Sequence, residues 1–91
     1  MLTLLLKNTI EKLTYIMDNF NYTISIIENS NKIERLYYSN KEAADNIYKA
    51  LYMIARYYIT DIYGVQLWQH AKGKTIDNDA RARIIKQYYI N

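Results

Sequence analysis

The chain has 91 residues, a formal net charge of +3 and no cysteine. This length fits a single domain, residues 1–91, and a hydrophobic content of 51% excludes a wholly disordered chain. Without cysteine there are no disulfides and no thiolate metal ligands, which is compatible with a reducing cytoplasm. No stretch approaches the roughly 18 uncharged apolar residues of a membrane span, so we expect no membrane-spanning segment.

Near the start of the chain, apolar residues recur at steps of four and three, which predicts an amphipathic helix over residues 2–18. Charged residues such as Lys7 and Glu11 lie on the opposite side of this helix. We therefore expect one face to pack against the rest of the fold. The apolar stripe consists of Leu6, Ile10, Leu13, Met17 and Phe20.

Alternation of apolar and polar residues follows and predicts an antiparallel hairpin over residues 22–38. A three-residue loop, residues 29–31, places Ile24 opposite Leu36 and gathers the apolar side chains on one face. Because an isolated hairpin is only marginally stable in water, we expect a helix to cover that face.

The segment from Ser39 to Glu42 matches a capping box, so a second helix is predicted from there to about Tyr63. Its apolar residues fill an arc of about 180°, against roughly 100° for an ordinary surface helix. Such an arc predicts that the helix is covered on more than one side, by the rest of the fold or by a second subunit. Ile47 and Leu51 lie in the middle of the arc and are predicted to be among the most buried residues.

Two further helices are predicted after Gly64, which interrupts the pattern. The first covers residues 65–72 and ends at Gly73, although one long helix kinked at Gly64 is the alternative. The last runs from residue 75 or 77 to about residue 89. The predicted fold is a single small α+β domain of order α-β-β-α-α-α, mostly helical, with a two-stranded antiparallel hairpin packed on the helices.

Three segments resemble ligand sites but lack essential parts. Residues 73–75, Gly-Lys-Thr, end like a phosphate-binding loop, but Trp68 replaces the required earlier glycine. His70 is the only histidine, and without cysteine a transition metal has too few ligands. Residues 77–79, Asp-Asn-Asp, begin like a calcium loop but lack its later glycine and glutamate. We therefore expect no enzyme activity, no metal and no cofactor.

The whole net charge lies in residues 70–91, because residues 1–69 hold seven basic and seven acidic side chains. Nucleic-acid grooves combine basic side chains with aromatic rings, and Tyr88 and Tyr89 supply such rings here. A solvated charged face explains the same residues without a ligand. The candidate nucleic-acid contacts are Lys72, Lys74, Arg83 and Lys86.

Eleven tyrosines, against one phenylalanine and one tryptophan, are the most distinctive feature of the composition. Tyrosine combines an apolar ring with a polar tip and is enriched at interfaces. Arg81 projects on the apolar side of the last predicted helix, where it either meets a carboxylate, a ring or another chain, or extends to solvent at the edge of the apolar stripe. The candidate interface residues are Tyr48, Tyr52, Tyr57, Arg81, Tyr88 and Tyr89.

The leading hypothesis is therefore a non-enzymatic, small oligomeric interaction protein, expected to form a homodimer and to bind a host protein. Abundant isoleucine, asparagine, lysine and tyrosine indicate an A/T-rich genome, and a short chain with this bias suits a virus or mobile element acting in the host cytoplasm. The alternative is a nucleic-acid-binding protein that uses residues 70–91. Steep weakening of binding with salt would distinguish the alternative from the leading hypothesis.

Overall fold

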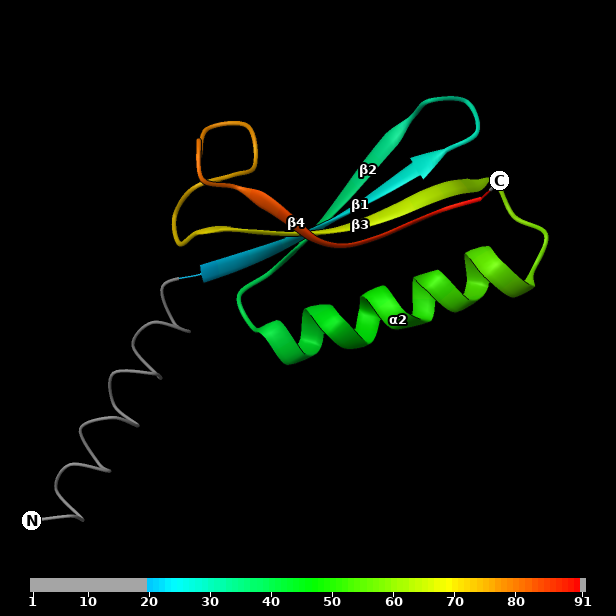
Figure 1. Ribbon diagram of the computed structural model, residues 1–91, viewed down its shortest axis with the longest axis horizontal. Helices are drawn as coiled ribbons and strands as arrows, with labels where there is room; N and C mark the ends of the chain where they lie inside the picture. The colour runs from blue at the N-terminus through cyan, green and yellow to red at the C-terminus, as the bar shows by residue number, and fades with distance from the viewer. Residues whose placement is uncertain (1–19, 91) are drawn as a thin grey trace, which may run out of the picture.

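The computed structural model describes residues 20–90, in which a four-stranded antiparallel sheet carries one helix on one face (Figure 1). The strand order is β2-β1-β3-β4, so β2 and β4 form the two edges. This part is α+β but rich in strand, so the predicted mostly helical order is wrong. The helix predicted over residues 2–18 lies outside the described residues. The elements are β1 (Phe20–Glu28), β2 (Ile33–Tyr38), α2 (Lys41–Tyr57), β3 (Ile62–Ala71) and β4 (Arg83–Tyr89).

The predicted hairpin is confirmed, with Ile24 of β1 opposite Leu36 of β2. In its turn, Asn31 has a φ of 69°, a left-handed conformation that asparagine tolerates better than most residues. The amide of Glu28 donates a hydrogen bond of 2.8 Å to the carbonyl oxygen of Lys32 and closes the loop. The turn residues and the alternation of apolar and polar residues therefore both favour the register that pairs Ile24 with Leu36.

Residues 62–71 and 83–89 form strands where two helices were predicted, and the alternative of one long helix through Gly64 is also wrong. A short apolar run is compatible with either a helix or a strand, so pairing with distant residues decides its structure. β3 pairs along its length with β1, which places Leu67 opposite Ile24. Gly73, with a φ of 81°, lies in the connection after β3 and does not cap a helix.

Helix α2 begins close to the predicted position but ends at Tyr57 and not near residue 63. Its N-cap is Asn40, whose side-chain oxygen accepts a hydrogen bond of 3.1 Å from the amide of Ala43. At the other end Tyr58 has extended backbone, with φ −126° and ψ 155°, and the chain turns there toward β3. The predicted capping box starting at Ser39 is therefore replaced by a simple asparagine cap one residue later.

The core lies between α2 and the sheet. From the sheet, Ile24, Val65 and Leu67 are completely buried. From the helix, Ala44 and Ala55 are buried against them, because small side chains let the helix approach the sheet closely. The two layers therefore meet through large residues on the strands and, on the helix, through two alanines together with Tyr48.

The prediction that Ile47 and Leu51 are among the most buried residues is wrong. Ile47 is 37% exposed, and Leu51 is half-buried at the rim of the core. The apolar arc of α2 is wider than the face that the sheet covers, and the sheet covers the part centred near Tyr48 and Ala55. The remaining part of the arc stays at the surface of the described structure.

The opposite face of the sheet is polar at its centre. Thr23 and His70 are buried there, with 2.7 Å between the threonine hydroxyl oxygen and the imidazole Nε2. The connection between β3 and β4, residues 72–82, lies over this side of the sheet, away from α2 (Figure 1). Arg35 of β2 fastens it by donating a hydrogen bond of 2.7 Å to the carboxylate of Asp77.

Candidate interaction sites

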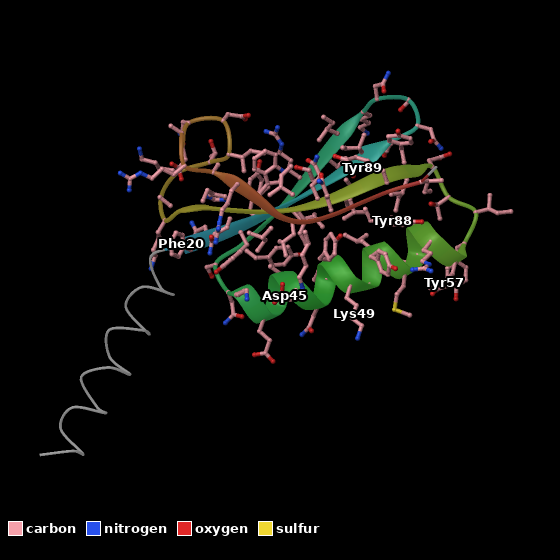
Figure 2. All side chains as sticks on the ribbon, viewed as in Figure 1. Phe20, Asp45, Lys49, Tyr57, Tyr88 and Tyr89 are labelled. Carbon is pink, nitrogen blue, oxygen red and sulfur yellow. The ribbon has the colours of Figure 1, made fainter. Side chains whose placement is uncertain are left out.

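Tyrosines of α2 and β4 lie around Arg56, in the second half of the helix. The Cζ of Arg56 is 5.8 Å from the ring centroid of Tyr52 and 5.3 Å from that of Tyr57, and its guanidinium donates a hydrogen bond to the Tyr52 hydroxyl. Tyr88 packs edge-on against Tyr52, with 4.9 Å between ring centroids and 84° between ring planes. Figure 2 labels Tyr57 on the helix and Tyr88 on the strand beside it. We call these four residues the tyrosine–arginine cluster.

The cluster presents both charge and apolar area to solvent. The hydrogen bond to Tyr52 and the neighbouring tyrosines raise the pKa of Arg56, so its positive charge persists at any physiological pH. Tyr57 is 64% exposed, while Tyr52 and Tyr88 are half-buried. Tyrosine and arginine are enriched among residues that dominate binding energy in protein interfaces. The cluster therefore has the composition of an interface centre.

The other residues predicted for an interface lie elsewhere. Tyr48 is 8% exposed in the core, where burial raises the pKa of its hydroxyl, so it is not at the surface of this chain. Tyr89 lies opposite Gly64, and its hydroxyl accepts a hydrogen bond from the side chain of Gln66. Arg81 is exposed in the connection that leads to β4, because no helix forms there.

Beside the cluster, β4 forms an edge of the sheet. Within residues 20–90 it pairs with β3 alone, so a second partner strand would find unpaired backbone groups along its outer side. The other edge, β2, carries Glu34 and Arg35, and charged side chains discourage pairing between edges. The end of β4 and the residue after it, residues 87–90, hold no charged side chain. Because β4 also carries two charged side chains, Arg83 and Lys86, it is the adjoining cluster that makes β4 the more suitable edge for strand addition.

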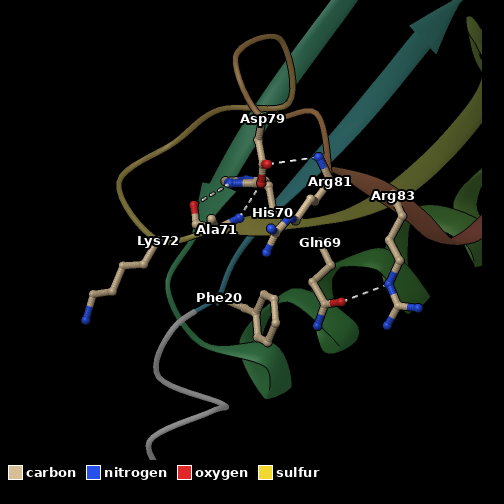
Figure 3. Close-up of a pocket in the computed structure, with 8 residues that line it drawn as sticks. All are labelled: Phe20, Gln69, His70, Ala71, Lys72, Asp79, Arg81 and Arg83. Carbon is tan, nitrogen blue, oxygen red and sulfur yellow. Dashed lines mark hydrogen bonds between the residues drawn. The ribbon is translucent and has the colours of Figure 1, made fainter.

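The second candidate site is an open pocket of about 470 Å³ at the end of the sheet where β1 begins (Figure 3). Antiparallel pairing places Gln69 of β3 opposite Arg83 of β4, and the Arg83 Nε donates a hydrogen bond of 3.0 Å to the Gln69 Oε1. We call this hollow the basic pocket. It is lined by Phe20, Gln69, His70, Ala71, Lys72, Asp79, Arg81 and Arg83.

Asp79 shapes the backbone beside the basic pocket. Its carboxylate accepts hydrogen bonds of 2.7 Å from the amide of Ala71 and 2.9 Å from the amide of Arg81 (Figure 3). These two bonds, together with the positive charge of Lys74, lower the pKa of the Asp79 carboxyl below its usual value. The carboxylate thus ties the connection to the end of β3 and stays ionised at neutral pH.

The structure brings together only part of the predicted nucleic-acid surface. Lys72 and Arg83 line the basic pocket, whereas Lys74 lines a neighbouring hollow with Tyr37 and His70. Lys86 lies on the side of the sheet that α2 covers, where its Nζ is 3.4 Å from a carboxylate oxygen of Asp45.

Arg81 lines the basic pocket, whereas the sequence predicts it to lie at an interface. On a helix, Arg81 and Arg83 point about 200° apart, so a helical reading separates them. In the structure Arg81 lies in the turn that precedes β4 and Arg83 is the first residue of the strand, and both line one pocket. The turn groups the two arginines, and no spacing pattern in the sequence indicates it.

His70 is occupied by structural contacts. Its Nδ1 is 3.3 Å from the carbonyl oxygen of Ala71, and its Nε2 faces the hydroxyl of Thr23. A neutral imidazole with the proton on Nδ1 satisfies both contacts, since it donates to the carbonyl and accepts from the threonine. Across residues 20–90, no group of three or more side chains of the metal-ligating kinds comes together. The helix in this part of the chain is not long and apolar enough to cross a membrane.

Comparison of the chain with models of protein families, with curated proteins and with solved structures finds no significant match. Any assignment of function therefore depends on the side chains described above. Within residues 20–90, three features are open to a partner: the tyrosine–arginine cluster with the adjoining edge strand, the basic pocket, and the exposed apolar part of the α2 arc.

Proposed function

We propose that this protein is a non-enzymatic interaction protein that forms a homodimer through β4 and the tyrosine–arginine cluster. The observation that supports this proposal is the packing of Arg56 against the rings of Tyr52 and Tyr57, with Tyr88 of the edge strand packed edge-on against Tyr52. Rings and guanidinium already contact one another within the chain. A partner that covers them therefore loses less conformational entropy than one that must order separate side chains.

A two-fold axis perpendicular to the sheet would pair β4 with β4 of a second copy. Both copies would then donate and accept backbone hydrogen bonds, and two four-stranded sheets would become one continuous sheet. Such an axis keeps both copies of α2 on the same face of the joined sheet. Because Tyr88 of β4 packs against Tyr52 of α2, the cluster lies on the β4 side of the helix. The two clusters would therefore approach each other across the dimer axis.

Sedimentation equilibrium at micromolar concentration tests this proposal. We expect the wild-type chain to have twice the mass of the monomer, and Tyr57→Ala to weaken dimerisation at least tenfold, the size of a typical hot-spot loss. Tyr58→Ala is the matched control, because Tyr58 is the next residue and is similarly exposed, at 68%, but lies outside the cluster. A monomeric wild-type chain, or equal effects of the two substitutions, would contradict the proposal.

The proposed biological setting follows from composition. We propose a virus or mobile-element factor in the host cytoplasm, because the amino-acid usage indicates an A/T-rich genome and the chain has no cysteine. A host protein is the proposed second partner, and the exposed apolar part of the α2 arc, which includes Ile47 and Ile54, is available to it in the described structure. A pull-down with the Ile47→Asp variant beside the wild type would show whether that surface is used.

A further inference from the structure

We propose that the basic pocket binds one nucleotide unit of a single-stranded nucleic acid. In this proposal the phosphate lies against Lys72, Arg81 and Arg83, and the base lies against the ring of Phe20. The pocket lies at the end of the sheet where β1 and β4 begin, whereas the cluster surrounds the second half of α2 (Figures 2 and 3). The pocket shares only Arg83, the first residue of β4, with the proposed dimer surface.

The charge of the pocket supports a phosphate ligand. Its three strongly basic side chains come from the connection after β3 and from the start of β4, and none forms an ion pair with another residue of the described chain. Of the two carboxylates in the same connection, Asp77 pairs with Arg35 outside the pocket, and Asp79 lines the pocket while it accepts hydrogen bonds from two backbone amides. Three basic side chains and one carboxylate leave the lining with a net charge of +2. Positive charges gathered without partners repel one another, and a bound anion relieves that repulsion.

The Arg83 side chain and the backbone that carries Arg81 are held in place before any ligand arrives. Gln69 orients the guanidinium of Arg83, and Asp79 fixes the backbone on both sides of the connection, at Ala71 and Arg81. Arginine presents several N–H donors in a planar arrangement that matches phosphate oxygens. Preorganised donors lose less entropy on binding, which favours a discrete site over a diffuse charged surface.

The size and lining of the pocket support a nucleotide more than a bare phosphate. A volume of about 470 Å³ is within the usual range of roughly 300–1,000 Å³ for small-molecule sites, and is far larger than one phosphate group requires. Phe20, the only phenylalanine of the chain, lies on the opposite side of the pocket from the connection (Figure 3). An aromatic ring beside arginines is the pairing on which unpaired bases stack in single-strand-binding proteins.

A single strand suits this geometry better than a duplex. Bases within a duplex are stacked on their neighbours, so a ring inside a pocket reaches a base only when the strand is unpaired. The pocket is open on one side, so the strand can continue away from it. The neighbouring hollow, which shares His70 and carries Lys74 and Tyr37, provides a further cation and ring for the adjoining unit.

Fluorescence anisotropy with labelled oligothymidylate at low salt tests the proposal on the full chain. We expect the double substitution Arg81→Gln with Arg83→Gln to weaken binding at least tenfold. It should also lower the salt slope by about 0.7, the contribution of the one single-strand phosphate that both arginines contact. The charge-matched control is Lys49→Gln with Lys86→Gln, which also removes two positive charges. One is on α2 and the other is on the side of the sheet that α2 covers. We expect the control to change the affinity less than twofold.

The ring contact is tested with Phe20→Leu, which keeps an apolar side chain but removes the aromatic face. It should weaken oligothymidylate binding at least threefold and leave competition by pyrophosphate unchanged. Where circular dichroism shows that the double variant is unfolded, Lys72→Gln replaces it, because Lys72 is exposed in the connection. Absence of binding by the wild type, equal losses in the two charge-matched doubles, or no effect of Phe20→Leu would each overturn the proposal.

Discussion

Replacement of Leu67 by alanine is expected to destabilise the protein by about 2–5 kcal/mol, the usual cost of emptying a filled core position. Leu67 is completely buried in β3, directly opposite Ile24, and both side chains belong to the layer that faces α2. The loss combines removal of apolar contacts with a cavity that the surrounding strands close only in part. Urea unfolding followed by circular dichroism measures it.

Leu36→Ala is the matched control for this experiment. Leu36 lies opposite the same Ile24 on the other side of β1, but it is 36% exposed on an edge strand. Its truncation removes fewer contacts and leaves an opening to solvent, so we expect less than half of the loss seen for Leu67→Ala. Equal losses at the two positions would mean that the core is not centred on β1 and β3.

Gly64→Ala is the second substitution with a large expected effect, a loss of about 1–3 kcal/mol from overpacking. Gly64 lies opposite Tyr89, whose ring covers it. An added Cβ would lie 2.7 Å from the Tyr89 Cε1 and 3.2 Å from the carbonyl oxygen of Tyr88, both closer than ordinary contact. Either the ring or the end of β4 must therefore move.

A double-mutant cycle with Tyr89→Ala separates this steric effect from any intrinsic preference of the strand for alanine. Without the ring, only the backbone contact remains, so Gly64→Ala should cost clearly less in the Tyr89→Ala background. Thermal unfolding of the four proteins provides the comparison. A cost that is the same in both backgrounds would refute the explanation by ring contact.

The parts of the fold that depend on local interactions are those that the sequence predicts well. The hairpin of residues 22–38 combines alternation with a turn whose asparagine accepts a left-handed conformation, so its register is evident from neighbouring residues. The start of α2 follows from a capping side chain within two residues of the predicted one. These signals act over a few residues and are independent of the rest of the chain.

The parts that depend on distant pairing were predicted wrongly. β3 is a strand because it adds to β1, and β4 is a strand because it adds to β3. Apolar residues in these segments have spacings that also fit a helix: Ile84, Ile85 and Tyr88, at positions i, i+1 and i+4, would share one helical face. Without knowledge of the pairing, propensity within each segment does not decide between the two structures.

The prediction of helices in place of β3 and β4 also determined which functional residues were found. Lys72 and Arg83 were identified from charge alone, whereas grouping Arg81 with them requires the turn that precedes β4. Tyr52, Tyr57 and Tyr88 were selected because tyrosine is abundant. Tyr52 and Tyr57 contact Arg56 within α2, whereas Tyr88 joins them only because β4 lies beside the helix. Composition therefore indicated the kinds of residue involved, and the arrangement of the strands determines where they meet.

Residues 83–89 must form an edge strand paired with β3 for either candidate site to exist. Nuclear Overhauser effects in the isotope-labelled chain test that pairing directly. Antiparallel pairing predicts cross-strand contacts between backbone protons of Val65 and Tyr88, and of Gln69 and Arg83, which are opposite each other in the register. Sequential amide–amide contacts running through residues 83–89, the pattern of a helix, without cross-strand contacts to β3, would contradict the fold and both sites.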